Sequence, residues 1–362
     1  MMKYSTLIGR KLMLSVHSTE AAILTSSKKP LDLANITLPR ELQSGQVLVK
    51  LITSGICGAQ INEIDAIKGP DLFLPHLLGH EGYGEVIEIG PGVKKIKPGD
   101  KVILHWRKSS GIEALPAKYF LGDQVINAGW VTTFSKHSIV SENRVTRIPD
   151  TGINKTLLPL LGCALTTSFG AVTYDTKLNK SHSIIVFGAG GLGLLITKFA
   201  STLKASSVIV IDKDPNKLKK ALELGATSVI HFISKEDALS QLRQLKSTGN
   251  IDFAYETTGA SDGIEISFEQ IANDGKVLLI GTPNQKSFIT IPTLPLHFGK
   301  TLVGSHGGST EPDRDIPVLV ELLARSELDL SLYPIEVISL DEINLAINEI
   351  RNGSVGRKII EF

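Results

Sequence analysis

The sequence predicts a two-part α/β protein, in which a β-rich domain is joined to a doubly wound parallel sheet. Up to about residue 160, short β-rich runs such as GQVLVKLI (45–52) and GEVIEIG (84–90) are separated by turn signals that include GPGV and KPGD. From about residue 183, short buried strands alternate with helices. This alternation is typical of a parallel sheet with helices on both faces.

The alternating part has five expected elements, which are strands at 183–187, 207–212 and 226–232 and helices at 193–203 and 214–224. The second helix carries clear signals, because Asp214 can cap its start, Pro215 suits its first turn and Gly225 suits its end. Beyond residue 306 we expect a helix at 315–329, then a short strand, a helix and a terminal strand at 357–362.

Composition excludes several classes of protein. At 362 residues, two domains are the default expectation. The net charge of +1 gives no basic field, so we expect no nucleic acid and no membrane as partner. Two cysteines cannot build a disulfide framework, and the first residues lack the apolar core of a signal peptide, so we expect a cytoplasmic protein. The longest near-apolar stretch is shorter than the roughly 20 residues that span a bilayer.

A glycine-rich motif follows the strand at 183–187. Gly188, Gly190 and Gly193 stand in G-x-G-x-x-G spacing, with Gly191 and Leu192 between them. The first glycine permits a tight turn, the second lets a pyrophosphate approach the backbone, and the third lets helix and strand pack closely. Glycine-rich turns also serve structural roles and occur in methyltransferases, so the motif alone is weak.

A carboxylate at the end of the next strand strengthens this interpretation. Asp212 lies 19 residues after Gly193, where it can accept hydrogen bonds from the adenosine ribose. Its charge repels a 2′-phosphate, which favours NAD over NADP. Lys213 is a counter-signal, since a cation at that point tolerates a phosphate.

Two cysteines and one histidine are candidates for a metal site. A lone Cys57, Cys163 or His80 is more often a core or surface residue than a ligand. Together, two thiolates and an imidazole with one position open make the environment of a catalytic zinc. Cys57 and Cys163 are 106 residues apart, so only the fold can bring them together.

The motifs together resemble the zinc-containing alcohol dehydrogenase family of the medium-chain dehydrogenase/reductase superfamily, which includes alcohol, sorbitol and threonine dehydrogenases. The resemblance covers nearly the whole chain and rests on GICG (55–58), GHEGYGEV (79–86), IKPGDKV (96–102), GC (162–163) and GAGGLG (188–193). It implies a GroES-like catalytic domain at 1–163 and 307–362, with a Rossmann domain at 164–306 between them. It also implies a homodimer or homotetramer.

The resemblance assigns roles to single residues. Cys57, His80 and Cys163 become the ligands of one catalytic zinc, and Glu81 becomes the adjacent carboxylate that can approach or transiently bind the metal. On the cofactor side, the residues assigned are Thr167 beside the nicotinamide, Lys217 at the ribose and Arg357 at the pyrophosphate. Lys217 can equally be a surface charge, whereas for Arg357 this alternative is less favoured.

Three departures from the family pattern stand out. Residues 105–130 contain none of the cysteines that hold a structural zinc in many relatives, so we expect no second metal. Ala59 and Asn62 stand where relatives often carry a hydroxyl and a histidine that relay the alcohol proton. The alcohol proton must then leave through water, Asn62 or a histidine such as His105. Gln60 replaces the carboxylate that orients the histidine ligand in relatives.

The predicted function is zinc-dependent hydride transfer between a primary or secondary alcohol and NAD. Trp106 aligns with a substrate-pocket aromatic, although core packing is its common alternative. His105, Arg107 and Lys108 beside it favour a polyol, a sugar or a sugar-derived alcohol. Two alternatives stay open: a zinc-free NADPH-dependent quinone or enone reductase of the same superfamily, and a non-catalytic nucleotide-binding regulatory protein on this fold.

Overall fold

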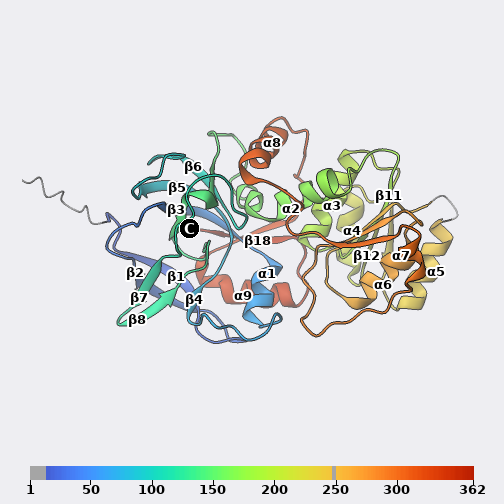
Figure 1. The fold of residues 1–362 in the computed structure, drawn as a ribbon, viewed down its shortest axis with the longest axis horizontal. Coiled ribbons are helices and arrows are strands. Elements are labelled where there is room, and N and C mark those ends of the chain that lie inside the picture. Colours follow the sequence, from blue (N-terminus) through green and yellow to red (C-terminus); the bar gives the residue numbers. More distant parts are fainter. Residues whose placement is uncertain (1–13, 247–249) are drawn as a thin grey trace, which may run out of the picture.

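The protein consists of two parts that lie side by side along its long axis (Figure 1). The computed structural model describes residues 14–246 and 250–362. The N-terminal part is β-rich, and the second part holds a parallel sheet between helices. The last strand, β18 (Arg357–Glu361), returns to the N-terminal part and pairs with β3 (Gln46–Ile56). The predicted α/β class with these two parts is confirmed.

The β-rich part contains a small barrel and a seven-stranded sheet. The barrel consists of β1 (Ser18–Leu24), β2 (Asp32–Thr37), β7 (Lys118–Leu121), β8 (Gln124–Asn127) and β4 (His76–Leu77). The sheet has the order β10 (Val145–Arg147), β6 (Lys101–His105), β5 (Glu81–Ile89), β3, β18 and β17 (Ile335–Ile338), with β9 (His137–Ser141) also paired to β3. The central strand β3 is buried along most of its length.

The second part is built on six parallel strands. Their order is β13 (Ser228–His231), β12 (Ser207–Asp212), β11 (Ser183–Phe187), β14 (Phe253–Glu256), β15 (Lys276–Leu279) and β16 (Thr301–Gly304). The chain order reverses between β11 and β14, so a crevice opens there at the carboxyl ends of the strands. The glycine-rich motif at 188–193 lies at this crevice.

Nine α-helices occur in residues 14–246 and 250–362, and none of these helices is both long and apolar enough to cross a membrane. They are α1 (Gly58–Ile64), α2 (Ala164–Gly170), α3 (Gly191–Thr202), α4 (Pro215–Glu223), α5 (Lys235–Lys246), α6 (Ser261–Gln270), α7 (Leu294–His297), α8 (Pro312–Ala324) and α9 (Ile343–Arg351). Asp214 caps α4 as predicted, because its side chain accepts a hydrogen bond from the Asn216 amide. The helix expected at 315–329 begins and ends earlier, since Pro312 suits a first helical turn.

One of the buried apolar clusters contains residues from both parts. Ile103 and Ile359 from the β-rich part belong to the same buried cluster as Leu194 from α3 and Val186 from β11. All six parallel strands lie within residues 183–304. The domain boundaries expected at 163/164 and 306/307 stay a prediction.

Candidate metal and cofactor site

The candidate metal donors come from three segments that meet at one end of the large sheet. Cys57 directly follows β3 and begins α1, and His80 directly precedes β5. Because β3 and β5 are antiparallel, with Ser54 opposite Gly82, the end of one strand meets the start of the other. Cys163 begins α2, which Gly162 brings against β5 and β6: a β-carbon on Gly162 would lie 2.3 Å from a carbonyl oxygen of β6.

The four side chains form a compact set of donors that fits a zinc ion. One donor atom each from Cys57, His80, Glu81 and Cys163 lies within 4.8 Å of the others. His80 Nε2 and Glu81 Oε2 are buried without a hydrogen-bond partner. A hydrogen bond from the Cys163 thiol lowers the pKa of Cys57 well below its ordinary value. The positive charge of Arg357 also lowers this pKa, and burial alone would raise it. Thiolates and an imidazole are the donors that zinc prefers.

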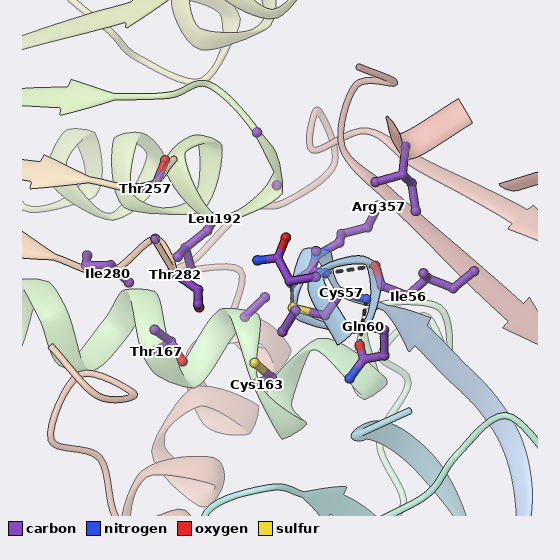
Figure 2. Close-up of a pocket in the computed structure, with 18 of the residues that line it drawn as sticks. Ile56, Cys57, Gln60, Cys163, Thr167, Leu192, Thr257, Ile280, Thr282 and Arg357 are labelled. Carbon is purple, nitrogen blue, oxygen red and sulfur yellow. Dashed lines mark hydrogen bonds between the residues drawn. The ribbon is translucent and has the colours of Figure 1, made fainter. Parts of the chain in front are cut away.

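Gln60 orients both of the first donors. Its side chain is 2% exposed, and its Oε1 accepts a hydrogen bond from the Cys57 backbone amide at 3.2 Å. The Nε2 atom of the same amide contacts His80 Nδ1. Figure 2 shows Gln60 below Cys57, and both residues line the same cleft. Gln60 therefore contacts both donors without contributing a charge.

Glu81 and Arg357 form a buried ion pair behind the donors. Arg357 Nη2 lies 3.0 Å from Glu81 Oε1, and Arg357 Nη1 donates to the Ile56 carbonyl at 2.9 Å. Burial raises the pKa of Glu81 to about 7, although Arg357 opposes this rise. Arg357 Nε is buried without a partner, and Arg357 lines the cleft together with Gly191. The contact with pyrophosphate stays a prediction.

The glycine motif takes the conformation expected of a nucleotide-binding loop. Gly188 follows β11 with φ of +96°, and a β-carbon on Gly193 would lie 1.8 Å from the Gly188 carbonyl oxygen. The loop needs glycine at both positions. Asp212 ends β12, and its Oδ2 accepts a hydrogen bond from the Ala189 amide at 2.6 Å. The helix α3 then begins at Gly191 and directs its N-terminus at the crevice.

A cleft of about 570 Å³ joins the metal donors to this loop. Figure 2 shows Cys57 and Arg357 on one side of the cleft and Thr167, Leu192 and Thr282 on the other. Of the predicted site residues, the cleft wall includes Cys57, Asn62, His80, Trp106, Cys163, Thr167, Gly190, Gly191, Leu192, Lys217 and Arg357. Gly188, Gly193, Asp212 and Glu81 support this wall from behind. The roles assigned to these residues stay predictions.

Several cleft residues were missed by the sequence analysis, among them Glu63, Lys68, Thr257, Thr282, Ser305 and His306. A signal for two of them exists, because Thr257 and Thr282 closely follow β14 and β15. The carboxyl ends of parallel strands are where ligands bind in such sheets. Glu63 and His306 carry no such local signal.

Trp106 is the only residue of the 105–108 cluster in the cleft wall. Its ring packs edge-on against the His306 ring, with 4.7 Å between the ring centroids. Arg107 binds backbone carbonyls of residues 306 and 310 instead of facing the cleft. His105 is 1% exposed, and its two ring nitrogens contact the Arg107 carbonyl and Thr146. His105 is therefore not placed to carry a proton from the cleft.

Comparisons with known proteins agree with this geometry. The family model described as "Alcohol dehydrogenase GroES-like domain" matches residues 43–150, and the one described as "Zinc-binding dehydrogenase" matches residues 191–325. The S-(hydroxymethyl)glutathione dehydrogenase of Escherichia coli O1:K1 is 27% identical over 370 residues, which covers 95% of this chain and 100% of that protein.

Solved structures show the same fold. The benzyl alcohol dehydrogenase of Acinetobacter calcoaceticus has a TM-score of 0.85 at 25% identity, with 96% of this chain and 100% of that chain covered. The 2R,3R-butanediol dehydrogenase of Bacillus subtilis has a TM-score of 0.76 at 22% identity, with 95% and 100% covered.

The fold and the donor set define a GroES-like catalytic domain joined to a Rossmann domain that serves a metal-assisted dehydrogenase. The chain belongs to the zinc-containing alcohol dehydrogenase family of the medium-chain dehydrogenase/reductase superfamily. Its substrates are small molecules, as this family membership implies.

Proposed function

We propose that the protein transfers a hydride between a primary or secondary alcohol and NAD, with one catalytic zinc per chain. The observation that carries this proposal is the junction of the two sites: Cys57, His80 and Cys163 open into the same cleft as the glycine loop. A bound zinc supplies Lewis acidity, which lowers the pKa of an alcohol and polarises a carbonyl, and a bound nicotinamide accepts or donates the hydride.

The residues of this chain would bind the metal, orient the cofactor and substrate, and exclude water from the cleft. Cys57, His80 and Cys163 would hold the metal, and two thiolates balance its charge. Glu81 lies behind them as a fourth donor that Arg357 keeps paired. Thr167 lines the cleft on the same side as Leu192 of the glycine loop, which supports a place for the nicotinamide there.

NAD is the favoured cofactor. The Asp212 carboxylate stands at the end of β12 with Oδ2 fixed by the Ala189 amide and Oδ1 by the Asp214 amide. A fixed negative charge can accept hydrogen bonds from ribose hydroxyls and repels a 2′-phosphate. The neighbouring cation Lys213 favours NADP instead.

A polyol, a sugar or a sugar-derived alcohol is the favoured substrate. This choice is supported by the polar side chains of the cleft wall, which are Thr282, Ser305, His306, Glu63 and Lys68. The Trp106 ring adds one apolar wall against which a carbon chain can pack. The test is turnover of NAD with a panel of polyols and simple alcohols, in which equal rates for both groups would contradict the choice.

Two alternatives lead to different measurements. A zinc-free NADPH-dependent quinone or enone reductase would contain no zinc after purification without chelator and would bind NADPH more tightly than NADH. A non-catalytic nucleotide-binding regulatory protein would bind cofactor but turn over no alcohol. Elemental analysis with NAD and NADP titrations tests the first alternative, and turnover with a panel of alcohols tests the second. We expect about one zinc per chain. Either zero or two would contradict the proposal.

A second copy of the chain is the partner we expect, as a homodimer or homotetramer. The strand β16 lies at the edge of the six-stranded sheet. Phe288, Leu294, Phe298 and Val303 lie on or near it with large exposed fractions. An exposed edge with apolar side chains favours pairing with the same edge of a second chain. Val303→Lys should then give a monomer in analytical ultracentrifugation, and a wild type that is already monomeric would contradict the expectation.

A further inference from the structure

The cleft contains an ionisable side chain near the metal donors whose acid–base chemistry the proposed function has not used. Glu63 lies on α1 and lines the cleft, as do Ala59 and Asn62 of the same helix. Ala59 and Glu63 are four residues apart, so their side chains lie on one face of the helix, about 6 Å apart along its axis. Ala59 stands at the position where relatives often carry a hydroxyl. Glu63 lies one helical turn beyond Ala59, further from Cys57.

Oxidation of an alcohol releases a proton that must leave the cleft. The methyl group of Ala59 cannot carry it, and the Asn62 amide neither gains nor loses a proton near neutral pH. The Glu63 carboxylate can do both. It is exposed to solvent at the cleft wall, and within residues 14–246 and 250–362 it makes no hydrogen bond and no ion pair.

We propose that Glu63 accepts the hydroxyl proton of the alcohol through bridging water and passes it to solvent, an inference that rests on the proposed function. The O–H bond breaks and the proton reaches the carboxylate, while the C–H electron pair leaves with the hydride to the nicotinamide and the C=O bond forms. In the reverse direction, protonated Glu63 supplies the proton that the new hydroxyl needs.

The charged groups around Glu63 suit this role. Lys68 lies on the loop after α1, and Asp71 and His76 pair with each other at 2.6 Å, while His80 stands on the metal side. Although the Glu63 side chain reaches solvent, desolvation by the surrounding protein raises its pKa above the ordinary value, and His76 and His80 oppose this rise. A carboxyl with a raised pKa exchanges protons more effectively near neutral pH.

The test compares Glu63→Gln with wild type in the zinc-loaded enzyme. Stopped-flow formation of NADH should slow by about tenfold or more at neutral pH, and the difference should shrink at high pH, where hydroxide takes the proton. Added imidazole should restore much of the lost rate relative to wild type at the same imidazole concentration, because a small base can enter an open cleft. The matched wild type accounts for imidazole that binds the zinc. A second readout measures proton release without hydride transfer. Trifluoroethanol is an alcohol that the enzyme cannot oxidise, so with NAD present an indicator dye reports only the proton that the bound alcohol loses. This release should be slower in Glu63→Gln than in wild type.

Two control variants make the test specific. Asp123→Asn removes an exposed carboxylate in the turn between β7 and β8 and should change nothing. His306→Asn removes the ring that contacts Trp106, and a rescue by imidazole there but not in Glu63→Gln would overturn the inference. An unchanged Glu63→Gln rate, or a loss that is equal at every pH and not rescued, would also overturn it while leaving the proposed function intact. A wild type that oxidises no alcohol would overturn both.

Discussion

Gln60 faces two groups that both need an acceptor once a metal is bound. If His80 offers Nε2 to zinc, its neutral ring carries its proton on Nδ1, which points at the Gln60 amide. The Cys57 amide also donates to this side chain, at 3.2 Å. The side-chain amide of Gln60 has only one oxygen. If that oxygen accepts from the Cys57 amide, the His80 Nδ1 proton faces the NH₂ group, and if the side chain is flipped, the Cys57 amide faces it instead. Without metal, the His80 proton can move to Nε2 and the conflict disappears.

Gln60→Glu should therefore bind zinc more tightly than wild type. The new side chain has the same shape and offers one oxygen to each donor. A buried donor without an acceptor costs about 1–3 kcal/mol, and this cost falls only on the metal-bound state. We expect the zinc dissociation constant to fall by about 10- to 100-fold, the range by which outer partners change metal affinity.

Competition with a chromophoric chelator measures this constant directly. Asn62→Asp is the matched control, because it adds the same charge on α1 without contacting either donor. A gain in Asn62→Asp equal to that in Gln60→Glu would attribute the effect to charge alone. An unchanged constant in Gln60→Glu would refute the hydrogen-bond argument.

Other predictions concern the cofactor, the relay, the ion pair and pH. Asp212→Gly should narrow or reverse a preference for NADH over NADPH in fluorescence titrations; equal affinities in wild type would contradict the role of Asp212. Ala59→Ser should raise the oxidation rate at neutral pH more than at high pH in stopped-flow traces, and no gain at any pH would argue that Ala59 makes room for substrate. Arg357→Met removes the partner of buried Glu81, whose pKa of about 7 should rise further. Urea unfolding should therefore show a loss of stability that grows above neutral pH, where the unpaired carboxylate must ionise, and Glu81→Gln should remove this pH dependence in the double variant. The pKa of His105 is lowered to about 4 by burial, so the unfolded chain binds its proton first as pH falls. Stability should therefore decrease from about pH 6.5 toward pH 4, by on the order of 3 kcal/mol for this residue, and His105→Asn should flatten the decrease in urea titrations at each pH.

Sequence alone determined the parts of this protein that depend on local chemistry. The strands at 183–187 and 207–212 match β11 and β12, because continuous apolar runs of that length are buried in a parallel sheet. The cap at Asp214 formed because a short polar side chain satisfies the first free amides of a helix. The glycine loop likewise follows from backbone geometry that glycine alone permits.

Tertiary structure decided which distant residues share the site. Cys57 and Cys163 meet because β3, β5 and α2 converge, and no spacing along the chain encodes that convergence. Arg357 faces Glu81 because β18 pairs with β3, so its guanidinium lies behind the metal donors as well as at the cleft. His105 and Trp106 are neighbours, yet His105 ends β6 and is buried, whereas Trp106 follows the strand and lines the cleft. Residue type and local pattern determine an element, whereas the contacts between elements depend on packing across the whole chain.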